Sequence, residues 1–161
     1  MQQVDAHTVA RWFLWRASQE RPARRVSNAK LQKLVYYAQA WHLAEVGDVL
    51  FPESIEAWIH GPVVPELYRE FRRFGDHPIV IAEGAPMPLL NGDLQAYLEE
   101  VWDVYGPYDA SYLETLTHQE SPWQLAREAA EFDPSGSLEI DHVWMRDYYR
   151  ALNEDLASRH G

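Results

Sequence analysis

The stretch that decides the fold runs from Ser27 to Gly47, SNAKLQKLVYYAQAWHLAEVG, and it predicts one long helix. Ser27 is a favoured N-cap residue, and Gly47 stands where a left-handed C-cap belongs. Few positions along its apolar side look exposed, so we expect the helix from Asn28 to Val46 at the centre of the core. The positions that recur at helical spacing are Leu31, Leu34, Val35, Ala38, Trp41 and His42.

The residues that follow predict a short strand, a rigid bend and another helix. The alternating run Ile55–Ile59 is typical of a strand. The segment Gly61–Pro65, GPVVP, which we call the elbow, breaks that strand and leads into a helix over Pro65–Phe74. A turn alone does not explain why three apolar residues, Val63, Val64 and Pro65, lie at this bend. A second apolar run, Ile79–Ile81, is the candidate partner for the first strand in a small hairpin.

Capping residues predict the remaining helices. We expect them over Asp5–Glu20, Asp93–Tyr105, Asp109–Thr117, Ser121–Glu131 and Asp141–Ser158, each capped by its first residue. The prediction is a mainly α fold: a single compact helical domain over residues 1–161, with about seven helices and a small two- or three-stranded β element.

The composition of the chain indicates its cellular location. The 161 residues include no cysteine, so disulfides and thiolate metal ligands are excluded. Residues 1–20 carry charges among their apolar side chains, unlike a signal peptide, and no run approaches the roughly 18 apolar residues of a membrane span. We therefore expect a cytoplasmic protein that does not contact a membrane.

The net charge of −11 is unevenly distributed. Through Gly75 there are ten Lys and Arg against eight Asp and Glu; from Asp76 onward there are four against seventeen. An acidic C-terminal half repels phosphates, so direct nucleic-acid binding is not expected. A local basic cluster is interpreted as solvated loop and helix-end charge, with an acidic docking partner as the alternative. Its members are Arg21, Arg24, Arg25, Lys30 and Lys33.

One polar cluster, Thr117–Ser121, raises the question of catalysis. His118 and Glu120 could form a metal pair or an acid–base pair, but side chains at i and i+2 do not share a helix face. The favoured interpretation is a corner between helices, with Ser121 as a cap, His118 bonded to backbone and Trp123 buried. No nucleotide or hydrolase motif is present. We therefore predict no catalytic site, metal or cofactor, and retain a metal-dependent hydrolase as an alternative.

Three segments resemble a known family. Lys30–Ala44 closely resembles the first signature helix of the Panacea domain, the SocA-like antitoxin family of phage-associated proteins. Ile55–Trp58 running into Gly61–Tyr68 resembles the second signature, and Leu116–Trp123, which includes His118, Glu120 and Pro122, resembles the third. The similarity spans about Ser27 to Arg127 in the same order and spacing. His60 departs from the family pattern, in which an aromatic such as Tyr is expected.

The resemblance implies the antitoxin of a toxin–antitoxin system, which neutralises a cognate toxin protein by direct binding. For some members it implies a proteolysis adaptor that delivers the toxin to a Clp protease, and this is the alternative partner. Aromatic side chains are favoured both in cores and at interfaces, so both roles stay open for those of the long helix. Our hypothesis for the toxin-binding surface comprises Tyr36, Tyr37, Trp41, Trp58, Gly61, Pro62, Val63, Val64 and Tyr68.

Overall fold

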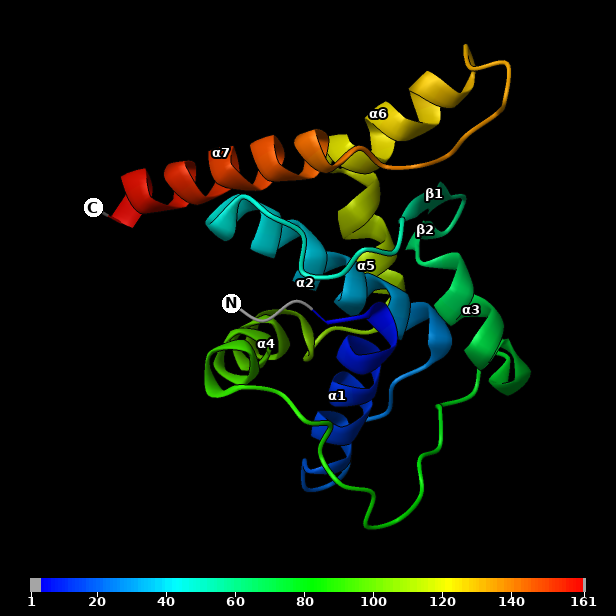
Figure 1. The fold of residues 1–161 in the computed structure, drawn as a ribbon, viewed down its shortest axis with the longest axis vertical. Coiled ribbons are helices and arrows are strands. Elements are labelled where there is room, and N and C mark those ends of the chain that lie inside the picture. The colour runs from blue at the N-terminus through cyan, green and yellow to red at the C-terminus, as the bar shows by residue number, and fades with distance from the viewer. Residues whose placement is uncertain (1–3, 161) are drawn as a thin grey trace.

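The computed structural model describes residues 4–160, which form seven α-helices, one 3₁₀ turn and a two-stranded antiparallel sheet (Figure 1). The mainly α prediction is confirmed. The elements are α1 (Ala6–Ser18), α2 (Asn28–Val46), β1 (Glu56–Trp58), β2 (Gly61–Val63), α3 (Pro65–Phe71), η1 (Arg72–Phe74), α4 (Gly92–Tyr105), α5 (Ala110–His118), α6 (Ser121–Ala130) and α7 (His142–His160). None of these helices is long and apolar enough to cross a membrane.

Helix α2 is the central element, as predicted. The Ser27 side chain accepts a hydrogen bond from the Lys30 N–H, and Gly47 ends the helix at a φ of 83°. Helices α1, α3, α4, α5 and α7 and strand β2 all contact it. Because α2 is surrounded on so many sides, even polar residues such as Gln32 and Gln39 are buried. Their amides bond to loop and strand backbone, which satisfies them inside the core.

The elbow itself supplies the second strand of the hairpin, so the predicted pairing with Ile79–Ile81 is wrong. β1 and β2 pair antiparallel, with Glu56 opposite Val63 and Trp58 opposite Gly61. The chain reverses at once through the turn at Ile59 and His60. Ile79–Ile81 instead lies extended near the start of α2, where the Ile79 N–H donates to the Val26 carbonyl.

Two predicted caps are wrong by one or two residues. α4 is capped by Asn91 rather than Asp93, since the Asn91 side chain accepts from the Leu94 N–H. Ser121 is the first residue of α6, and Glu120 holds the N-cap position without making a side-chain capping bond. The Glu120 side chain is buried instead. The predicted caps Asp5 and Asp109 are confirmed.

Gly61 is required at the start of β2 for two reasons. Its φ is 113°, a conformation that L side chains rarely adopt. A Cβ at this position would also lie 2.8 Å from Cε of Lys33 and 3.1 Å from Oγ1 of Thr117. The first contact would require the end of the Lys33 side chain to shift, and the second is tighter than nine in ten Cβ contacts, so the hairpin backbone lies close against α2 and α5.

We predict that Gly61→Ala lowers the free energy of unfolding by about 2–4 kcal/mol, because backbone strain and overpacking add. Urea unfolding followed by circular dichroism measures this. Gly84→Ala is the matched control: φ there is 75°, but nothing lies within 4 Å of the added Cβ. It should cost about 1 kcal/mol, from strain alone. Equal losses for the two variants would contradict the close packing of the hairpin.

Candidate functional site

A buried carboxylate joins three separate parts of the chain. Glu120, only 5% exposed, lies at the corner between α5 and α6. Its Oε1 accepts hydrogen bonds from the hydroxyls of Tyr37 on α2 (2.7 Å) and Tyr149 on α7 (2.8 Å). The hydroxyl of Tyr36 lies 3.0 Å from that of Tyr149. We call Glu120 with these three tyrosines the tyrosine cage.

The tyrosine cage connects to the surface through stacked aromatic rings. The ring of Tyr37 stacks on Tyr105 of α4 at 3.9 Å between centroids. The Tyr105 hydroxyl in turn accepts a hydrogen bond of 2.7 Å from Nε1 of Trp41. Trp41 is half-buried, so this series of contacts runs from the interior to the solvent. It fixes α4 relative to α2 through both packing and polar contacts.

Burial sets the ionisation of the cage. Loss of solvent raises the pKa of Glu120 to about 7, and the hydrogen bonds from Tyr37 and Tyr149 oppose this rise. Burial also raises the pKa of Tyr37, chiefly by desolvation, with the Glu120 charge adding to it. The tyrosines therefore stay protonated donors, and the carboxyl exchanges its proton near neutral pH. Its burial keeps this group away from any substrate in solution.

The corner at Glu120 also holds the β-hairpin. On α6, Trp123 donates from Nε1 to the Trp58 carbonyl (2.8 Å), and Arg127 donates to the Ala57 carbonyl (3.0 Å). The family-like segment Leu116–Trp123 thus lies against the family-like segment that contains the hairpin. Trp123 is only half-buried. The His118 ring stacks on it at 4.1 Å, and the buried His118 Nε2 has no hydrogen-bond partner, so stacking rather than the predicted backbone bond orients this ring.

Glu120 and His118 do not assemble a metal site. Within residues 4–160 no group of three or more His, Asp or Glu side chains is arranged to hold a metal ion. The Oε1 atom of Glu120 is engaged by two tyrosines, and the His118 ring is covered by Trp123. Pro122, the remaining residue of this segment, is buried at the start of α6 and fixes its first turn.

Most residues of the hypothesised toxin-binding surface are interior. The exposure expected for Tyr36 and Tyr37 is wrong, since both rings are enclosed in the cage. Trp41 and Trp58 are half-buried, and Tyr68 is 36% exposed. The elbow residues are also buried, because β2 of the hairpin lies against α2: Gly61, Pro62, Val63 and Val64.

The hairpin turn presents residues that the sequence analysis missed. Ile59 is 66% exposed, and the neighbouring His60 is also exposed, with its ring 2.9 Å from Glu114. Beside the turn, the rings of Trp58 and Tyr68 meet edge to face at 5.0 Å. A bulky apolar residue at an exposed turn flanked by two aromatics is typical of a binding surface. The alternating pattern predicted a strand over Ile55–Ile59, but it did not indicate that Ile59 would be the exposed end.

The pKa of Glu120 leads to a prediction about stability. The ordinary pKa of a glutamate is 4.5, as in the unfolded chain, whereas burial raises the pKa of Glu120 in the folded chain to about 7. Between these values the folded state binds more protons, so stability falls as pH rises and then levels off. Glu120→Gln keeps an acceptor for both tyrosines without this dependence. We expect its stability relative to the unmodified chain to increase by up to about 3 kcal/mol from pH 4.5 to 8.

Chemical unfolding at a series of pH values measures this difference. Glu139→Gln provides a control, because Glu139 is exposed and lies outside the cage. A constant difference for Glu120→Gln across the range would show that Glu120 titrates normally and that the cage is not closed to water.

Comparison with known proteins identifies the family. The family model described as Antitoxin SocA-like, Panacea domain, matches residues 31–124, which include most of α2, the hairpin and the corner at Glu120. A curated relative, Antitoxin SocA of Caulobacter vibrioides (strain NA1000 / CB15N), is 30% identical over 161 aligned residues, covering 92% of this chain and 84% of the relative. No solved structure matches the chain. The chain therefore belongs to the SocA-like antitoxin family and carries its Panacea domain.

Proposed function

We propose that this chain is a cytoplasmic antitoxin that neutralises a cognate toxin protein by binding it directly, without chemistry of its own. The observation that carries this proposal is the exposed turn of the hairpin. We define the hairpin surface as Trp58, Ile59, His60 and Tyr68. The name of the relative, Antitoxin SocA, supports the same role.

Rigidity makes the hairpin surface suited to binding. Its backbone is paired across β1 and β2, and two α6 side chains hold the β1 carbonyls. The Trp58 indole is also oriented by a hydrogen bond of 2.8 Å to Glu56. A surface that is ordered before binding loses little conformational entropy when a partner docks. Aromatic and large aliphatic side chains on such a support are the usual anchors of protein interfaces.

The buried elbow residues have a supporting role in this proposal. Val63 ends β2 and Val64 follows it; both are buried, and the Val64 N–H donates to the buried amide oxygen of Gln32 on α2. The elbow thereby attaches the hairpin to α2. Substitutions there should change toxin binding only by altering the fold, whereas substitutions at the turn should change binding alone.

The experiment measures binding of the toxin encoded by the neighbouring reading frame. The double variant Ile59→Asp, Tyr68→Ala should bind at least about tenfold more weakly, because each anchor contributes about 1–2 kcal/mol. The melting temperature should fall only slightly, since Ile59 is exposed and Tyr68→Ala removes one edge-to-face contact with Trp58. The matched control is Val104→Asp, Tyr112→Ala, an exposed aliphatic and tyrosine on α4 and α5.

The outcomes separate the possible roles. If the unmodified chain does not bind the toxin, direct neutralisation is wrong. If it binds and the two double variants weaken binding equally, the toxin docks elsewhere. If toxin is bound yet stays active until a Clp protease degrades it, the chain is a proteolysis adaptor rather than a direct inhibitor.

A further inference from the structure

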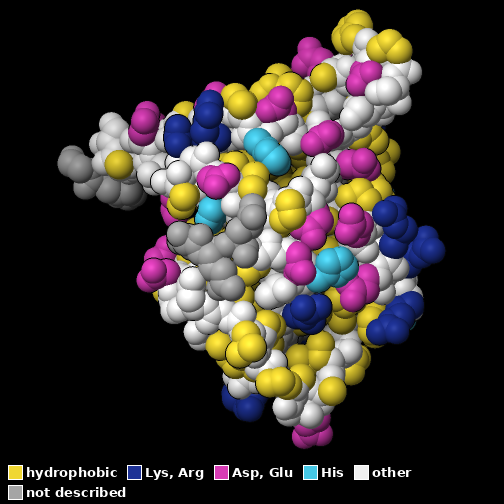
Figure 2. All heavy atoms as spheres, viewed as in Figure 1, with side chains coloured by type: hydrophobic (Ala, Val, Ile, Leu, Met, Phe, Trp, Pro, Cys, Tyr) yellow, Lys and Arg dark blue, Asp and Glu magenta, His cyan; other side chains and the backbone are white. Residues whose placement is uncertain are grey.

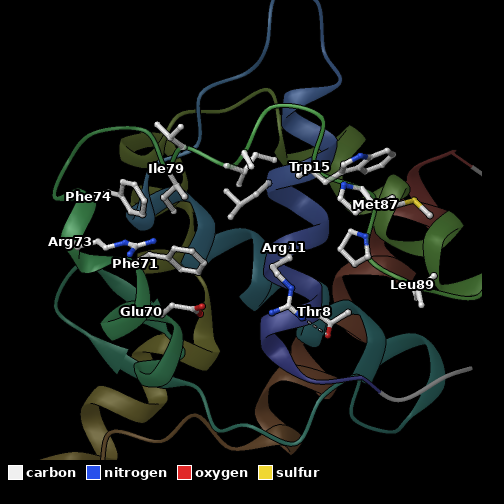
Figure 3. Close-up of a pocket in the computed structure, with 17 residues that line it drawn as sticks. Thr8, Arg11, Trp15, Glu70, Phe71, Arg73, Phe74, Ile79, Met87 and Leu89 are labelled. Carbon is white, nitrogen blue, oxygen red and sulfur yellow. Dashed lines mark hydrogen bonds between the residues drawn. The ribbon is translucent and has the colours of Figure 1, made fainter.

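A second surface, built from other elements, forms a large groove. Its cavity of about 740 Å³ lies between α1, the end of α3 with η1, and the segment Ile79–Leu89, which we call the strap. Figure 3 shows Trp15 and Arg11 on the α1 side, Phe71, Arg73 and Phe74 on the opposite side, and Met87 and Leu89 along the strap. In Figure 2 hydrophobic side chains gather at the end of the molecule where the strap runs.

The backbone of the strap has unused hydrogen-bonding capacity. Ile79–Ile81 is β-branched throughout and follows an isolated bridge between Pro78 and Ser27, yet within residues 4–160 it belongs to no strand itself. Beyond the bond from Ile79 to Val26, the N–H groups of Val80, Ile81 and Ala82 donate to no protein group in this part of the chain. Val80 is 76% exposed. A β-prone run with free backbone groups is a template for an added strand.

Cavities lie on both sides of the strap. A further cavity of about 310 Å³ lies on the side of Ile79–Ile81 that faces Ala17 and Val26, while Ile79, Ile81 and Met87 pack against the core. Side chains entering the larger groove would meet an apolar floor of Trp15, Phe71 and Phe74.

The charge of the groove opposes that of the whole chain. Arg11 and Arg73 line it, and neither guanidinium lies within 4.0 Å of a carboxylate among the described residues. The acidic side chain of the wall, Glu70, is 2.7 Å from His7. Exposed Arg25 lies on the far side of the strap. Arg11 donates to the Thr8 hydroxyl at 3.4 Å, and Arg73 lies over the Phe74 ring at 4.9 Å. A chain with a net charge of −11 therefore offers guanidinium groups without a carboxylate partner beside an apolar floor.

We propose that this groove binds an extended segment of a partner protein in which apolar and acidic residues alternate, and that the segment adds as a strand to Ile79–Ile81. Backbone bonds to the strap provide affinity, and the alternate side chains select the sequence. Apolar side chains on one face reach the floor, while carboxylates pair with Arg11 and Arg73. This site is independent of the hairpin surface and of the toxin-binding role proposed above.

The test uses a fluorescein-labelled peptide of about eight residues in which valine and glutamate alternate, with binding measured by fluorescence anisotropy. We expect a dissociation constant below about 1 mM, and slower amide hydrogen exchange at Val80 and Ala82 in the complex, because N–H groups alternate between the two edges of a strand and that of Ile79 already faces Val26. The same peptide with lysine in place of glutamate should bind at least about tenfold more weakly, and so should one with N-methylated backbone amides.

The second part of the test reverses the charge of two arginines in the protein. Arg11→Glu with Arg73→Glu should weaken binding of the acidic peptide at least about tenfold. Arg69→Glu with Arg72→Glu, two exposed arginines outside the groove, is the matched control and should change it by less than about threefold. Circular dichroism checks the fold. If the first pair does not fold, Arg11→Gln with Arg73→Gln is used in its place.

Several results would overturn the proposal. One is the absence of binding up to about 1 mM peptide. Another is equal binding of the N-methylated peptide, which would exclude strand addition. Equal weakening by the two charge-reversal pairs would mean that only long-range charge attracts the peptide. Binding of dodecanoate without any binding of the peptide would identify the groove as a site for an amphipathic anion instead.

Discussion

The hydrogen bonds from Tyr37 and Tyr149 to the carboxylate of Glu120 are the constraint on which the arrangement of the helices depends. Glu120 lies between the last residue of α5, His118, and the first residue of α6, Ser121, so its hydrogen bonds hold the start of α6 against α2 and α7. Trp123 and Arg127 on α6 then hold the β-hairpin by its carbonyls. A satisfied buried polar network favours one packing over near alternatives, because every other arrangement leaves a buried group without a partner.

The cage also explains why residues that look suited to recognition are interior. A family-like motif rich in tyrosine invites the interpretation of a binding groove, yet the hydroxyls of Tyr36 and Tyr37 face a buried carboxylate. In the proposed function, their contribution to toxin binding is indirect, through the position of the hairpin. The residues proposed to contact the toxin are those of the hairpin surface, such as the exposed Ile59.

Local signals predicted much of the fold. The cap at Ser27, the glycine at position 47 and the apolar spacing between them determine α2, and each acts within one or two helical turns. The strand pairing could not be predicted, because Ile79–Ile81 has the better β composition. The elbow is the second strand because Gly61 packs against Lys33 and Thr117, which are distant in the sequence. The role of Glu120 was missed for a similar reason: its two partners lie 83 and 29 residues away along the chain.

The central claim is that the cage and corner hold the hairpin while its turn contacts the partner. Amide hydrogen exchange of the free chain and of its complex with the toxin tests this most directly. We predict that exchange slows in the complex at Trp58–Gly61 and stays unchanged in α2, whose amides are already protected. Slowed exchange confined to other elements, with Trp58–Gly61 unaffected, would contradict the account.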